Sequence, residues 1–258
     1  MRAAEAETLT PGVGSSGLAT ISPMDSPVLP EVQAAFDRER SDARARPPAD
    51  AAAFRTQTIS MYGRLAALQA DAIARTRVEF ACKRGCSYCC HLRVEIRPHE
   101  AFTLAHYIAT KFDAGHRARM LRRIEENRQR IAPLSPQAHV RAGIACALLD
   151  EHGACTAYEA RPAACRKYHS MSVDVCRNAF NDTEAPLTGE IEHEDVRLAG
   201  NAVALGFAKG LEDAGYDIAL YELHDALHRA LTDPRSERRY RRGKRAFVKQ
   251  PGDATASR

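Results

Sequence analysis

Tryptophan is absent from this 258-residue chain, and aromatic residues make up only 6% of it. A hydrophobic content of 45% still supplies enough apolar side chains for a packed core, which must therefore be mainly aliphatic. No apolar run approaches the ~18 residues that a membrane-spanning helix needs. Residues 1–30 contain acids near the start and no continuous apolar stretch, which argues against a secretory signal. We therefore expect a cytoplasmic protein with no membrane partner.

Helical patterns dominate the middle of the chain. Residues 1–30 are rich in Pro, Gly, Ser and Ala and are predicted to be disordered. Two short apolar runs, 144–149 and 154–158, flank a connection with Asp and Gly, which predicts a small β-hairpin. The predicted fold class is mainly α, in which a helical domain over residues 50–232 frames a cysteine-ligated metal site beside that hairpin. Apolar periodicity and helix boundary signals place its main helices at 50–80, 98–111, 116–131, 195–214 and 217–231.

Positive charge is concentrated near the C-terminus. The formal net charge is +4, and eight Lys and Arg residues stand with a single Glu between Arg235 and Lys249. That segment therefore carries +7, and the remainder of the chain carries −3. We expect residues 235–258 to form a basic, flexible tail that the metal site does not need. Such a run can bind nucleic acid or an acidic protein partner, and a solvated tail without a ligand is the alternative.

The eight cysteines all lie between residues 82 and 176. Four of them fall within nine residues, and the other four follow after a gap of 55 residues. In a reducing cytoplasm such a pattern indicates metal or redox chemistry rather than disulfides. A buried structural cysteine needs no thiol neighbour, whereas a metal centre needs several thiolates at one point. The predicted metal ligands are Cys82, Cys86, Cys89, Cys90, Cys146, Cys155, Cys165 and Cys176.

Local spacing within the first group allows two geometries. Cys86-x2-Cys89 has the spacing of a metal knuckle, and Gly85 suits its turn. A helix over the same residues would also place the four sulfurs on one face, so both geometries bring them together. A helix face that uses Cys as a small hydrophobe is the structural alternative. In the second group the hairpin would pair Cys146 with Cys155, while Cys176 is either a ligand or a buried thiol.

These motifs carry a resemblance to a known family. The string CKRGCSYCC, followed by Cys155-x2-Tyr-x2-Arg-Pro-x2-Cys165-Arg, resembles the YkgJ-type cysteine-cluster family, a zinc- or iron-chelating domain with a CxxCxxCC signature. The resemblance spans about residues 82–166, and Glu100 is similar to the acidic position of that family. The first cysteine pair departs from the signature, because three residues separate Cys82 from Cys86 instead of two. The resemblance implies a metal site and assigns no reaction.

All-thiolate ligation suits both zinc and iron–sulfur centres. Adjacent Cys89 and Cys90 favour a wide multinuclear centre, so we predict an iron–sulfur cluster, with zinc as the alternative cofactor. Arg161 and Arg166 flank Cys165, and we expect them to contact the cofactor by donating hydrogen bonds or offsetting its charge. The alternative for both arginines is a structural tie to a carboxylate, Glu159 or Glu100.

Two functions follow from these alternatives. The first is an iron–sulfur protein with a redox role, or one that supports an enzyme, acting with a protein partner. The second is a zinc-stabilised interaction module whose Arg-rich tail contacts nucleic acid or an acidic partner. Among the histidines, His91 and His169 are minor candidates for outlying ligands. His224 and His228 stand four apart on a helix without a catalytic Glu, which favours a solvated helix face.

Overall fold

A computed structural model describes residues 29–76, 78–183 and 192–247 of the chain. Over these ranges the chain forms ten α-helices, two 3-10 helices and one two-stranded sheet. The α-helices are α1 (Leu29–Ala45), α2 (Ala51–Thr76), α3 (Pro98–Lys111), α4 (Ala114–Ile131), α5 (Pro136–Arg141), α6 (Ala163–Lys167), α7 (Val173–Asn181), α8 (Glu194–Asp213), α9 (Leu223–Thr232) and α10 (Pro234–Arg241). The 3-10 helices are η1 (Tyr88–His91) and η2 (Tyr158–Ala160), and the strands are β1 (Glu95–Ile96) and β2 (Tyr221–Glu222).

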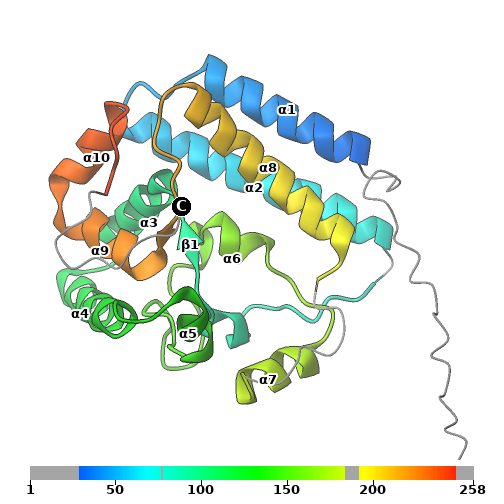
Figure 1. Ribbon diagram of the computed structural model, residues 1–258, viewed down its shortest axis with the longest axis vertical. Helices are drawn as coiled ribbons and strands as arrows, with labels where there is room; N and C mark the ends of the chain where they lie inside the picture. The colour runs from blue at the N-terminus through cyan, green and yellow to red at the C-terminus, as the bar shows by residue number, and fades with distance from the viewer. Residues whose placement is uncertain (1–28, 77, 184–191, 248–258) are drawn as a thin grey trace, which may run out of the picture.

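Three long helices, α1, α2 and α8, lie side by side in one layer (Figure 1). Small residues let α1 approach α8 closely. A Cβ atom added to Gly206 would lie 2.5 Å from the Phe36 carbonyl oxygen, and one added to Gly210 would lie 2.4 Å from that of Arg40. Both distances are shorter than van der Waals contact, so this helix pair depends on glycine at these positions.

A second group of helices, α3, α4, α9 and α10, packs beneath that layer and shares its core. Leu65 of α2, Leu104 of α3, Leu211 of α8 and Leu227 of α9 are all fully buried, so the core is mainly aliphatic as the composition requires. Strands β1 and β2 pair antiparallel, and this pairing joins the segment after the first cysteine group to the start of α9.

The mainly α fold class predicted from the sequence is confirmed. Helix α3 has the predicted bounds, and Asp50 caps α2 by accepting a hydrogen bond from the Ala53 N–H at 2.8 Å. The predicted hairpin contains only one isolated bridge, which pairs Cys155 with Leu149 and not with Cys146 as expected. No helix in the described ranges is both long enough and apolar enough to cross a membrane.

The ends of the predicted domain differ from the expectation. Most of the segment predicted to be disordered, residues 1–28, lies outside the described residues. Helix α1 precedes the predicted domain start at residue 50, yet it packs along α8 and belongs to the same helical body.

The structure also differs from the expected flexible tail over residues 235–247. Helix α10 covers much of this basic segment. The side chains of Tyr240 and Phe247 are only 1% and 2% exposed. The Tyr240 ring contacts Phe54 and Phe102 at centroid distances of 4.9 and 5.6 Å. Two buried aromatic side chains therefore anchor the segment, although most of its other side chains are charged. Residues 248–258 lie outside the described part of the chain.

Substituting Tyr240→Ala is expected to lower the free energy of unfolding by about 3–5 kcal/mol, because it removes a buried ring and leaves a cavity. Urea unfolding followed by circular dichroism measures this change. Arg241→Ala on the exposed face of the same helix is the control and should stay within about 0.5 kcal/mol of the wild type. Equal effects of the two substitutions would show that this segment does not pack on the core.

Buried His99 on α3 should make stability depend on pH. Its Nδ1 lies 3.3 Å from the Thr58 hydroxyl, and its Nε2 has no hydrogen-bond partner among the described residues. Burial, with the nearby Arg97 charge, lowers the pKa of His99 from 6.5 to about 3. Between these values the unfolded chain binds a proton that the folded protein excludes, so stability is present above pH 6.5 and is lost as the pH falls.

We therefore expect His99→Asn to reduce the loss of stability between pH 7 and pH 4.5 by about 2 kcal/mol relative to the wild type. Chemical unfolding at the two pH values measures the difference. His152→Asn is the control, because the His152 side chain is 80% exposed and should leave the pH dependence unchanged. An unaltered pH dependence in His99→Asn would contradict the assignment.

Candidate metal centre

The first cysteine group lies on a turn followed by a 3-10 helix, and not on a continuous α-helix. The Cys86 N–H donates to the Lys83 carbonyl at 3.1 Å and closes the turn. Gly85 adopts φ of +91°, in the left-handed region that favours glycine. Helix η1 then carries Cys89 and Cys90 on consecutive positions. Of the two local geometries compatible with the sequence, the structure has the turn.

The second cysteine group contacts the first directly. The Cys146 N–H donates to the Cys90 carbonyl at 2.8 Å. The 55 residues between the two groups therefore start and end at the same place in the structure. Beyond Cys146, the side chain of Asp150 accepts hydrogen bonds from the N–H groups of His152 and Ala154. This turn returns the chain and brings Cys155 opposite Leu149.

Six of the eight thiols line a single cavity of about 460 Å³, and they come from both groups. Leu104, Leu148 and Leu223 supply apolar wall, and the Arg161 side chain also lines the cavity. Every cysteine is a free thiol. Within the described ranges, no three His, Cys, Asp or Glu side chains stand close enough together to hold one metal ion. The six lining cysteines are Cys86, Cys89, Cys90, Cys146, Cys155 and Cys165.

Cys82 and Cys176 lie outside the set that lines this cavity. The Cys82 sulfur accepts a hydrogen bond from the Ser170 N–H at 3.1 Å, and this side chain is exposed. Cys176 lies on α7, which packs against η1. All eight cysteines were predicted together, and six of them line the cavity; Cys82 lies near enough to Cys86, Cys89 and Cys176 for these groups to raise its pKa, after burial as the main cause.

Burial makes three of the lining thiols weaker acids than an exposed cysteine. It raises the pKa of Cys146 to about 11 and is the main cause of the raised pKa values of Cys155 and Cys165. The pKa of Cys89 is also raised, first by its hydrogen bond with Cys90 and second by burial. A bound metal cation stabilises the thiolate form and reverses this preference.

Arg161 and Arg166, predicted as a pair, have different positions. The Arg161 guanidinium stacks on the Tyr158 ring at 3.6 Å from the centroid, and its buried Nε has no hydrogen-bond partner among the described residues. Arg166 turns away from the cavity, donating to the carbonyls of Arg161 and Glu159 and stacking on Tyr62. Of this pair, only Arg161 lines the cavity and could interact with a group inside it.

Glu100 positions the short helix that carries Cys165. This side chain of α3 is only 3% exposed, and it accepts a hydrogen bond from the Ala163 N–H at 2.7 Å. It also accepts from the Arg97 N–H at 3.0 Å and from the Tyr62 hydroxyl. A buried carboxylate with three donors fixes the first turn of α6 against α3, and the acidic position noted in the sequence is here an anchor for that helix.

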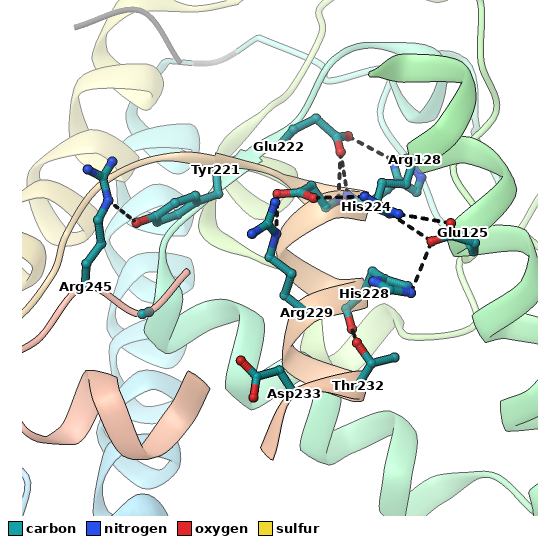
Figure 2. A network of polar contacts seen from close by, with 12 residues as sticks. Glu125, Arg128, Tyr221, Glu222, His224, His228, Arg229, Thr232, Asp233 and Arg245 are labelled. Atoms are coloured by element: carbon teal, nitrogen blue, oxygen red, sulfur yellow. Dashed lines mark hydrogen bonds and ion pairs between the residues drawn. The ribbon is translucent and has the colours of Figure 1, made fainter. Parts of the chain in front are cut away.

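Glu222 and His224 form a buried pair (Figure 2), and His224 also binds the segment that follows Cys146. The Glu222 carboxylate caps α9 and lies 2.8 Å from Nδ1 of His224. His224 Nε2 accepts the Ala147 N–H at 3.2 Å. Asn127 of α4 adds a hydrogen bond to the Ala145 carbonyl at 2.7 Å. The second cysteine group is therefore held from α4 and α9.

This network corrects the expectation of a solvated helix face at His224 and His228. His224 is 4% exposed, while His228 is partly buried and contacts Glu125 of α4. The sequence contained no signal for the role of His224, because its acceptor bond joins residues 77 positions apart. Its spacing from His228 indicated only a shared helix face.

The two histidines considered as outlying ligands are engaged elsewhere. The ring of His91 packs against Phe180 of α7 at 4.7 Å, and its Nδ1 lies 3.0 Å from the Ser87 carbonyl. His169 is 6% exposed, and its Nε2 accepts the His193 N–H at 2.9 Å, while Nδ1 faces the Lys167 carbonyl. The imidazole rings of His91 and His169 therefore each connect two segments of the chain near the cavity.

The side chains around the cavity fit a thiolate-bound metal group. Thiolate sulfur is a donor that both zinc and iron–sulfur centres take, and an arginine lining the same cavity can offset the negative charge of such a centre. The six thiols would supply its ligands, and the apolar wall would limit contact with water.

Comparison with known proteins agrees with this chemistry. Residues 81–186 match the model of the CxxCxxCC family, described as a "putative zinc- or iron-chelating domain". The match covers the whole cysteine region and none of the helices α1 to α2 or α8 to α10. No curated protein and no solved structure matches the chain.

His224→Ala is expected to lower both stability and metal content. It removes the acceptor of the Ala147 N–H and takes the imidazole away from the buried Glu222 carboxylate, at a cost of about 2–4 kcal/mol. Because the second cysteine group then loses its link to α9, bound metal per chain should fall as well. His228→Ala, one turn further along α9, is the matched control and should keep its metal. Full metal occupancy in a folded His224→Ala variant would refute the positioning role.

Proposed function

We propose that the cysteine-lined cavity holds an iron–sulfur cluster, in a chain whose residues 81–186 match the model of a domain described as zinc- or iron-chelating. The observation that carries the proposal is the convergence of six thiols from both cysteine groups on one cavity of about 460 Å³. The family match supports metal binding in general. The iron–sulfur cluster, and the redox chemistry that it would provide, go beyond that match and are part of the proposal.

The number and spacing of the thiols favour a cluster over one zinc ion. A structural zinc site is complete with four ligands, whereas six cysteines line this cavity. No three candidate ligands in the described ranges stand close enough together to hold one ion, whereas a centre with several iron atoms binds thiolates that lie farther apart.

The surrounding residues would tune such a centre. An iron–sulfur cluster bound by four thiolates is negatively charged and transfers single electrons. The Arg161 guanidinium would offset that charge from the cavity wall. Leu104, Leu148 and Leu223 would keep water away and lower the local dielectric constant, which also influences the reduction potential. We therefore propose a role in electron transfer or in support of the chemistry of a protein partner.

A structural zinc site is the second candidate, and one observation favours it. The segments that carry the cysteines have little regular secondary structure, with short helices of three to nine residues. Such segments gain stability when a metal joins them, because the free energy of metal binding contributes to folding. In this alternative the centre would hold the fold together and take no part in redox chemistry.

Metal analysis after anaerobic purification separates the two candidates. For the iron–sulfur proposal we expect iron and acid-labile sulfide in similar amounts, together with a brown colour that bleaches on reduction. A colourless protein with stoichiometric zinc and no sulfide would overturn the proposal and support the structural alternative.

Two cysteine variants test which thiols bind the cluster. Cys89→Ser should lose most of the iron and sulfide, because Cys89 lines the cavity. Cys176→Ser is the matched control, since Cys176 lies outside the lining set, and it should keep them. The same loss in both variants would show that the peripheral thiol is also a ligand. Retention of iron and sulfide by Cys89→Ser would place the cluster elsewhere.

A further inference from the structure

A second concave site, lined only by basic side chains, lies at the C-terminal helix α10. Its hollow has a volume of about 300 Å³, roughly ten times the ~30 Å³ that one water occupies in the liquid. In Figure 1, α10 lies on the opposite side of the molecule from α7, which carries Cys176. None of the residues that line the hollow also lines the thiol cavity, so the two sites are separate. We call it the basic hollow, and its lining residues are Arg235, Arg238, Arg239, Arg242 and Lys244.

The backbone beneath the basic hollow is held firmly. Tyr240 and Phe247 anchor it in the core, as described above. Arg239 is tied to the Asp233 carboxylate at 2.8 Å and to the Ala246 carbonyl at 2.9 Å. Gly243 allows the turn after α10, with φ of +67°. Because the backbone is fixed, the cations of the hollow lie near one another before any ligand binds, which lowers the entropic cost of binding.

Most of the positive charge in the hollow lacks a local counter-charge. The two acids of this segment are engaged, because Asp233 pairs with Arg239 and Glu237 with Arg55 at 3.3 Å. Over the described ranges, no ion pair involves the four remaining basic side chains of the hollow. Four cations that face one hollow repel one another, and a multivalent anion relieves that repulsion. These four residues are Arg235, Arg238, Arg242 and Lys244.

We propose that the basic hollow binds a compact phosphate-rich anion, such as the di- or triphosphate group of a small molecule or inorganic polyphosphate. Guanidinium groups donate paired hydrogen bonds that match phosphate oxygens, and four of the five lining residues are arginines. The phosphates of a nucleic acid share this chemistry. A nucleic-acid groove, however, commonly adds aromatic platforms for the bases, and no aromatic side chain lines the hollow.

Isothermal titration calorimetry of the full chain with sodium tripolyphosphate tests the proposal. We expect one binding event per chain that weakens as salt is added, because the contacts are ionic. The double variant Arg238→Gln, Arg242→Gln should lose roughly tenfold or more in affinity, since each charge-assisted hydrogen bond contributes substantially. The double variant Arg122→Gln, Arg130→Gln, which removes two exposed arginines of α4, should bind as the wild type does.

Tripolyphosphate also chelates metals, and the design accounts for this effect. Both double variants keep all eight cysteines, so heat from chelation would appear equally in both and cannot imitate a loss specific to α10. A single-stranded 20-nucleotide DNA is titrated in parallel. The proposal fails if tripolyphosphate does not bind, if the two double variants bind it equally, or if DNA binds and tripolyphosphate neither binds nor competes.

Discussion

The cysteine-bearing segments hold little regular structure of their own, so their positions depend on buried hydrogen bonds to the helical body. Glu100 on α3 accepts the Ala163 N–H and sets the helix of Cys165. His224 on α9, oriented by Glu222, accepts the Ala147 N–H and sets the segment of Cys146. A buried polar group is costly unless paired, so each bond strongly specifies one arrangement. The thiol cavity exists because helices far apart in the sequence present these acceptors.

The helical body and the cysteine region thus have different structural roles. The body supplies an aliphatic core and the close packing of α1 on α8, and it carries the acceptors. The cysteine region supplies thiols on turns and short helices, and six of these thiols line one cavity. This division agrees with the extent of the family match, which covers the cysteine region alone. The basic hollow on α10 belongs to the body and offers a separate site with different chemistry.

Much of the fold was predictable from sequence, because helix boundaries depend on local signals. Pro98 and Lys111 bound α3 as predicted, and the clustering of the cysteines pointed to one centre. The role of His224 was not predictable, since its partner lies 77 residues away. The burial of Tyr240 and Phe247 was also missed. In the sequence alone, a segment with two apolar residues among many charged ones has the pattern of a solvated tail. Long-range burial, and not local propensity, decided both cases.

The central claim is that the two cysteine groups serve one metal centre. Metal content per chain, measured for Cys90→Ser and Cys146→Ser after anaerobic purification, tests it most directly. A shared centre predicts that each substitution removes nearly the whole metal load, because each group supplies ligands that the other cannot replace. If each variant keeps about half of the metal and only the double variant loses all of it, the groups bind separate ions and the account of a single composite centre is contradicted.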